Sequence, residues 1–142
     1  MTRNRRSTTE VLSCCSAVML IGLSGCSQKF DGDVVLFNST GRDIKWCGFK
    51  GAPELVIGGV LLDNGCAVED VGPSFVLPEV VTVYWEFEGG GKNQVAVTLR
   101  NVVPSRYHGD LVFEIMPDET VQLRLDTNRA YLDRPRKRKD SR

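Results

Sequence analysis

The stretch Val81-Thr82-Val83-Tyr84-Trp85-Glu86-Phe87-Glu88 decides the fold class, because apolar side chains occupy every second position. Successive side chains of a β-strand point to opposite faces, so the odd-numbered residues are expected to face a core and the even-numbered residues to face water. This period of two differs from the 3.6-residue period of a helix. Residues 81–88 are therefore predicted to form a half-buried β-strand.

Similar short apolar runs, separated by turn-forming residues, occupy most of the chain beyond its N-terminal part. They are residues 34–37, 44–47, 95–100, 111–115 and 121–125. Gly89-Gly90-Gly91 and Asn64-Gly65 are turn signals between such runs. About seven or eight short strands with no amphipathic helix of useful length predict an all-β fold, a single antiparallel β-sandwich over residues 33–128. The largest side chains of its core are expected to be Trp46, Trp85, Phe87 and Phe113.

The N-terminus resembles an export signal rather than part of the fold. Arg3, Arg5 and Arg6 precede an uncharged, mostly apolar stretch from Val11 to Leu23. As a helix this stretch would reach only about 20 Å, short of the roughly 30 Å hydrocarbon core of a membrane. Residues 1–25 are therefore predicted to be a cleaved signal peptide and not a permanent transmembrane helix.

Leu23-Ser24-Gly25-Cys26 resembles the lipobox of bacterial lipoproteins. The resemblance implies that the Cys26 thiol is acylated, carries palmitate, and becomes the first residue of the mature protein. Residues 26–32 would then form a short lipidated tether to the membrane. Ser27 stands where an Asp typically signals inner-membrane retention, which favours the outer membrane, facing the periplasm. The alternative is an ordinary secretory signal that happens to contain a cysteine.

The cysteine count adds a second prediction, because five is an odd number for an exported protein. Cys14 and Cys15 leave with the signal and Cys26 is acylated, so Cys47 and Cys66 remain. In an oxidising compartment these two are predicted to form a disulfide, with two free buried thiols as the alternative. A metal site is disfavoured because the chain has a single histidine and no Cys-x-x-Cys pair.

The charge of the predicted mature chain is unevenly distributed. Residues 129–142 hold seven basic and two acidic residues, whereas residues 26–128 hold eight basic and fifteen acidic residues, a net charge of −7. The basic segment, residues 129–142, is predicted to be a disordered tail that either solubilises the protein or contacts anionic headgroups. The acidic body and the exported location argue against nucleic-acid binding.

No combination of residues in the sequence indicates catalysis. Ser105, His108 and Asp110 could suggest a triad, but three such residues within one short loop seldom align, because triads draw on distant segments of a rigid scaffold. Gly89-Gly90-Gly91-Lys92 lacks the spacing of a phosphate loop. Pairs such as Glu86 with Glu88 offer too few oxygens for calcium. We therefore predict a protein that is not an enzyme, with no catalytic residues, metal or cofactor.

Three stretches resemble a family of small proteobacterial lipoproteins of uncharacterised domain type. They are Phe37-Asn38-Ser39-Thr40-Gly41-Arg42-Asp43-Ile44, Leu77-Pro78 followed by Val81-Thr82-Val83-Tyr84-Trp85, and Gly109-Asp110-Leu111-Val112-Phe113 leading to Met116-Pro117-Asp118. Together they span most of residues 34–126. The chain departs from the family around Cys66, where members usually have a Gly-rich stretch ending in adjacent cysteines, and this puts the disulfide partner in doubt.

Members of that family are often encoded beside type VI secretion lipase effectors and are regarded as their immunity proteins. The resemblance implies a non-catalytic binding protein that occludes a secreted effector in the periplasm, and an acidic body would suit a partner with a basic face. The alternative is a structural or envelope-assembly lipoprotein that docks to another envelope component.

Overall fold

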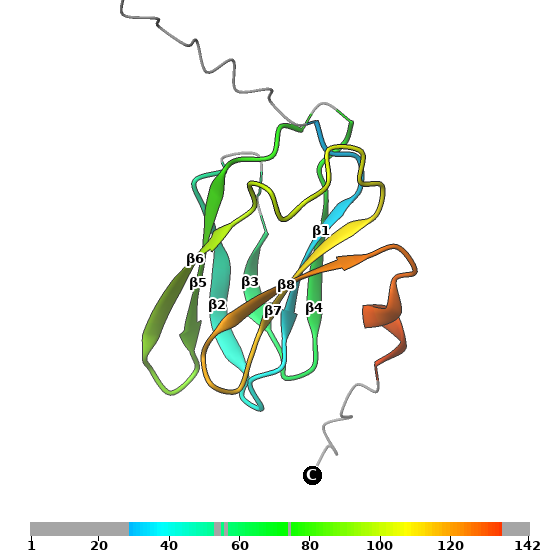
Figure 1. Cartoon of the computed structure of the whole chain (residues 1–142). Helices are drawn as coiled ribbons and strands as arrows, with labels where there is room; N and C mark the ends of the chain where they lie inside the picture. The colour runs from blue at the N-terminus through cyan, green and yellow to red at the C-terminus, as the bar shows by residue number, and fades with distance from the viewer. Residues whose placement is uncertain (1–28, 53–54, 56, 74, 135–142) are drawn as a thin grey trace, which may run out of the picture.

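Eight β-strands and one 3₁₀-helix make up the computed structural model, which describes residues 29–52, 55, 57–73 and 75–134 (Figure 1). The elements are β1 (Asp33–Asn38), β2 (Ile44–Lys50), β3 (Gly58–Leu61), β4 (Cys66–Asp70), β5 (Val80–Phe87), β6 (Lys92–Thr98), β7 (Asp110–Ile115), β8 (Val121–Asp126) and η1 (Ala130–Asp133). The strands form two four-stranded sheets, in the orders β4-β1-β7-β8 and β3-β2-β5-β6. We call these the β1 sheet and the β5 sheet. The prediction of an all-β sandwich is confirmed.

The two sheets pack face to face over one apolar core. β5 has the predicted alternation: Val81, Val83, Trp85 and Phe87 are all buried. Phe113 reaches across from the β1 sheet, where its ring meets that of Phe49 edge-to-face at 5.0 Å between centroids. Neighbouring strands are antiparallel except β1 and β7, which run parallel.

Trp46 was expected in the core, and this prediction is wrong, because the side chain is 51% exposed. The reason is a β-bulge in β2. Ile44 pairs with Phe87 and Trp46 with Glu86, so two steps along β2 match one step along β5. The extra residue shifts the alternation: Lys45 and Trp46 both lie on the exposed side, and the next buried residue is Cys47.

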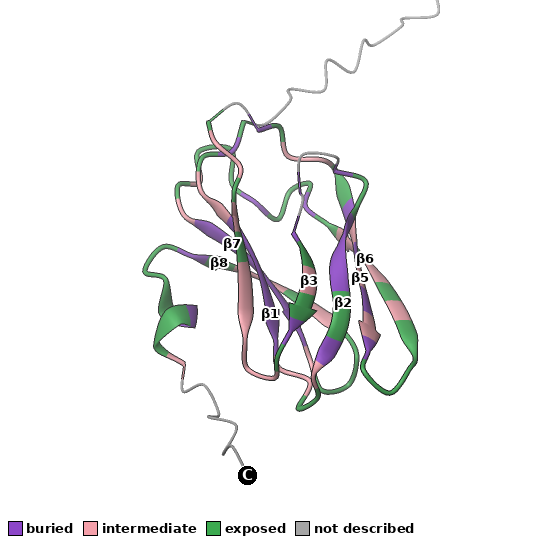
Figure 2. Ribbon diagram, turned by 180° about the vertical axis from the view of Figure 1, so that it is seen from behind, coloured by how far each residue is buried: buried purple, intermediate pink, exposed green. Residues whose placement is uncertain are grey.

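The two central strands of the β1 sheet, β1 and β7, are buried on both faces, as the continuous buried colour of β1 in Figure 2 shows. Its inner face belongs to the inter-sheet core. On its outer face Val35, Phe37 and Val112 form a second apolar cluster with Tyr131 of η1. Strands with apolar residues on both faces need such a cover.

The cover consists of residues 129–134, which we call the C-terminal strap. The predicted disordered tail at residues 129–142 is therefore wrong for its first six residues, because Tyr131 is 3% exposed and held against the sheet. The remaining tail, residues 135–142, lies outside the described residues. So do the predicted signal peptide and Cys26, and no helix in the described part of the chain is long and apolar enough to cross a membrane.

Candidate functional site

The strap is fixed to the β1 sheet by charged residues at each end. At its first end the Arg129 guanidinium contacts Asp33 at 2.9 Å and Asp110 at 3.5 Å. The Tyr131 hydroxyl donates a hydrogen bond to Asp110 at 2.9 Å. Asp110 also accepts a hydrogen bond from the Asp33 backbone N–H at 3.2 Å, so this buried carboxylate connects β1, β7 and the strap.

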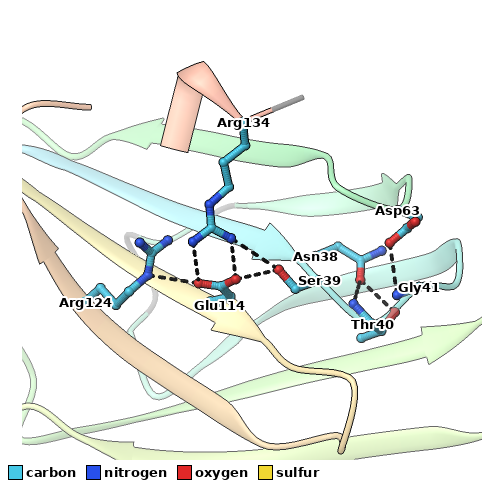
Figure 3. Close-up of polar contacts among 8 residues, drawn as sticks. All are labelled: Asn38, Ser39, Thr40, Gly41, Asp63, Glu114, Arg124 and Arg134. Carbon is cyan, nitrogen blue, oxygen red and sulfur yellow. Dashed lines mark hydrogen bonds and ion pairs between the residues drawn. The ribbon is translucent and has the colours of Figure 1, made fainter. Parts of the chain in front are cut away.

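At the other end of the strap, Arg134 meets Glu114 on the outer face of β7 (Figure 3). Arg134 donates two hydrogen bonds to the Glu114 carboxylate, at 2.5 and 3.3 Å. Ser39 donates a third at 2.5 Å, and Arg124 forms an ion pair with Glu114 at 2.9 Å. The Glu114 side chain is only 6% exposed. Arg134 of the strap and Arg124 of β8 cover it.

The pKa values of the carboxyl groups at the two ends of the strap are shifted in opposite directions. Burial tends to raise the pKa of Glu114, but the hydrogen bonds from Arg134 and Ser39 and the charge of Arg124 prevail, so its pKa is lowered. The pKa of Asp33 is raised, first by burial and then by the neighbouring charge of Asp110. Glu114 therefore stabilises the strap as an anion, whereas the surroundings of Asp33 disfavour its ionised form.

The first family-like stretch forms the turn that closes this end of the sandwich. Asn38 is fully buried. Its amide donates to the carbonyls of Arg42 and Leu61 at 2.8 and 3.1 Å, and its side-chain oxygen accepts from Thr40 (Figure 3). Asp63 accepts a hydrogen bond from the backbone N–H of Gly41 at 2.9 Å. These contacts join the β1–β2 and β3–β4 connections, so Asn38, Thr40 and Gly41 have a structural role.

The loop with Ser105, His108 and Asp110 is not arranged as a triad. Ser105 and His108 are exposed, whereas the Asp110 carboxylate is buried and accepts its hydrogen bonds from Asp33 and Tyr131. An aspartate in a triad would instead orient the histidine. Within the described residues, no group of three or more His, Cys, Asp and Glu side chains is placed to hold a metal ion.

Cys47 and Cys66 are both free thiols, so the predicted disulfide between them is wrong. Cys47 belongs to the core between the sheets, and its thiol donates to the carbonyl of Gly59 at 3.5 Å. Cys66 packs against the cluster on the outer face of the β1 sheet. The β1 sheet thus lies between the two residues. Burial raises the pKa of Cys47 to about 11, which keeps this thiol protonated.

The exposed face of the β5 sheet carries the aromatic residues Trp46 and Tyr84. Register places Gly48 beside Tyr84. A Cβ on Gly48 would lie 2.6 Å from the Tyr84 hydroxyl oxygen, so only glycine leaves room for this ring. A Cβ on Gly58 would lie 3.7 Å from the Trp46 indole, which therefore lies close to β3. Gly48 thus allows the Tyr84 ring to lie along the sheet, whereas the space beside Gly58 would also admit a Cβ.

A groove of about 560 Å³ opens on this face between the aromatic residues and β6. Its lining residues are Trp46, Lys50, Tyr84, Trp85, Glu86, Lys92, Asn93 and Gln94. The volume lies in the range of small ligand sites, and the mixture of aromatic and polar groups suits binding rather than core packing. We call this surface the Trp46 face.

Sequence reasoning missed both the strap and the Trp46 face. A signal for the strap was present, because Val35, Phe37 and Val112 are apolar at positions that face away from the core. The bulge that exposes Trp46 has no comparable local signal, since the alternation of Ile44 with Trp46 is regular in the sequence.

No family model matches the chain, and no curated protein matches its sequence. The chain is similar to a solved structure described as an NMR structure of a protein from Eubacterium rectale, at 14% identity and a TM-score of 0.43. That similarity covers 75% of this chain and 95% of the other. The family resemblance of the sequence motifs therefore stays a prediction, and the functional interpretation depends on the surfaces described above.

Proposed function

We propose that this protein is an envelope-anchored, non-catalytic binding protein that holds a partner protein on the Trp46 face. The observation that carries the proposal is the half-exposed Trp46, presented by a bulge on the outer side of a sheet whose inner side is tightly packed. Interface energy concentrates in a few large side chains, and Trp and Tyr are prominent among them. A rigid strand also holds such a side chain at little entropic cost to binding.

The position of the Trp46 face suits a protein attached to a membrane through Cys26. Lys29, three residues after Cys26, pairs with Val76, which precedes β5. Trp46 pairs with Glu86 near the far end of that eight-residue strand, about 20 Å away along it. In Figure 1 the described chain begins at one end of the sandwich and the β5–β6 hairpin lies at the other. An anchor at Cys26 would therefore leave Trp46 toward the end of the sandwich that is far from the membrane.

The resemblance of the sequence motifs makes a secreted lipase effector the first partner to test, so that the protein would act as its immunity protein in the periplasm. An envelope-assembly component is the alternative. The two differ in gene neighbourhood, because an immunity protein is expected beside the gene of its effector.

The anchor is tested by Cys26→Ser. We expect the precursor of this variant to remain uncleaved and to incorporate no labelled palmitate, whereas the wild type is labelled. Normal palmitate labelling of the variant would contradict the lipoprotein assignment.

The binding function is tested by mixing residues 27–142 with the lipase encoded beside the gene. We expect stoichiometric suppression of lipase activity, loss of suppression in Trp46→Ala, and full suppression by the Ser105→Ala, His108→Ala double variant. Sub-stoichiometric action that the double variant abolishes would indicate catalysis instead. The absence of any neighbouring effector gene would favour the envelope-assembly alternative.

A further inference from the structure

We infer that the partner segment bound at the Trp46 face is an acidic stretch of polypeptide that carries an apolar side chain. This inference rests on the proposed function and adds the chemistry of the partner. It also departs from the expectation, drawn from the net charge of the body, that the partner presents a basic face.

The first support is the local charge. Residues 26–128 carry a net charge of −7, yet three of their eight basic residues, Lys45, Lys50 and Lys92, lie on this one face. Glu86 is the only acidic residue of the groove lining, and it contacts Lys45 at 3.8 Å and Lys92 at 3.6 Å. The face is therefore positive on an acidic protein, and such local contrast steers and orients a partner of opposite sign.

Lys50 supplies the clearest binding group for an anion. Its ammonium lies 5.1 Å from the centre of the Tyr84 ring and 3.4 Å from the side-chain oxygen of Gln94. Among the described residues it has no carboxylate within ion-pair distance. A partner carboxylate could therefore reach this ammonium without first displacing an ion pair to any of the described residues.

The second support is the apolar part of the same face. Trp46 and Tyr84 line the groove, and the exposed Val60 of β3 lies opposite the bulge that presents Trp46. The groove volume of about 560 Å³ accommodates an apolar side chain of a partner together with its flanking backbone. An apolar anchor bordered by acidic residues matches both features of the surface.

Charge disfavours two other occupants that the chain itself could supply. Residues 135–142, which follow the strap, hold five basic residues and one acidic residue, so Lys45, Lys50 and Lys92 would repel them. A second copy related by two-fold symmetry would bring the same lysines against one another. A separate, acidic chain complements the charge of this surface better than either of these occupants does.

The test uses nitrogen-15 NMR of residues 27–142 titrated with short synthetic peptides. One peptide contains Glu and Ser with a central Leu; the matched peptides replace Glu by Gln or Leu by Ala. We expect the acidic peptide with Leu to shift the Trp46 indole N–H signal and the amides of β2, β5 and β6. The other two should bind at least about tenfold more weakly, a difference of ~1.4 kcal/mol. Added salt should weaken the binding of the acidic peptide, because it screens the attraction between opposite charges.

Variants assign the charge effect to this face. The double charge reversal Lys50→Glu, Lys92→Glu should abolish binding of the acidic peptide, whereas Arg106→Glu, an exposed basic residue of another loop, should leave it unchanged. The buried Trp85 indole signal checks that each variant is folded.

Equal binding of the Glu and Gln peptides, shifts confined to another surface, or an unaffected double reversal would overturn the inference. The lipase assay separates this failure from failure of the proposed function. Suppression lost in Trp46→Ala but retained in the double reversal would uphold the function and reject the acidic partner. Suppression retained in Trp46→Ala would reject the Trp46 face itself.

Discussion

The two outer faces of the sandwich differ in whether another segment of the chain covers their apolar residues. On the β1 sheet Val35, Phe37 and Val112 point outward and are buried, because the strap lies over them. On the β5 sheet no described segment covers Trp46, which is 51% exposed. One face is thus completed by the chain itself, and the other leaves a large aromatic residue available to another molecule.

The difference shows that exposure of an apolar residue is informative only after the internal covers are identified. An isolated exposed valine is ordinary on any protein surface. An exposed Trp beside a groove, on a protein that covers its other apolar face with a dedicated segment, supports the proposal that this is a binding surface.

Among the substitutions on the two outer faces, the largest effect on stability is expected for Tyr131→Ala. This change removes a buried ring from the covered face and the hydrogen bond to Asp110, so the free energy of unfolding should fall by about 3 kcal/mol. Urea titration measures it. Leu132→Ala is the matched control, because its side chain is 47% exposed and the loss should stay within about 0.5 kcal/mol. Equal effects would mean that the strap does not cover the sheet.

Glu114→Gln should cost about 2 kcal/mol, because it leaves Arg134 and Arg124 without their charged acceptor next to the sheet. Glu79→Gln is the control, since the Arg100–Glu79 pair is exposed and such pairs contribute little, roughly 0.5 kcal/mol or less. A loss at Glu79 as large as that at Glu114 would contradict the role of burial.

The Glu114 contribution should depend on pH. Its pKa is lowered on folding from an ordinary value of 4.5, so the stabilisation is complete above that value and is lost as the pH falls through the folded pKa. The difference in urea midpoint between wild type and Glu114→Gln should therefore shrink below about pH 4.5. Asp33, whose pKa is raised, titrates in both proteins and largely cancels in the difference. A constant difference down to low pH would contradict the assignment.

Trp46→Ala on the open face should change stability by about 1 kcal/mol or less, while it removes partner binding. Trp85→Ala, in the core of the same sheet, is the contrasting variant and should cost about 4 kcal/mol. Thermal unfolding followed by circular dichroism compares the two. A large destabilisation by Trp46→Ala would show that this residue is structural.

The smallest effect is expected from a reducing agent. Cys47 lies in the core between the two sheets, Cys66 packs on the outer face of the β1 sheet, and both thiols are free, so reductant should leave the urea midpoint unchanged. A disulfide closing that loop would contribute about 3 kcal/mol. Thiol tagging of the denatured, unreduced monomer should add one tag at each position. Protection of both thiols would contradict the structure.

The sequence by itself determined the fold class and most of the core. Regular alternation in residues 81–88 is enough to assign inward and outward faces, because the period of two is a local property of an extended chain. The turn residues between short apolar runs likewise separate the strands that the structure contains. For Ser105, His108 and Asp110 the sequence shows only that they share one loop, and the structure adds that the Asp110 carboxylate accepts hydrogen bonds from Asp33 and Tyr131.

Only the tertiary structure decided how the two outer faces differ. The bulge in β2 depends on how that strand pairs with β3 and β5, so the exposure of Trp46 could not be read from local alternation. The pairing of Arg134 with Glu114 joins residues twenty positions apart across two turns of the chain. The separation of Cys47 from Cys66 depends on which sheet each strand enters. In each case the outcome was set by the register and stacking of strands, which are long-range properties that short sequence patterns do not contain.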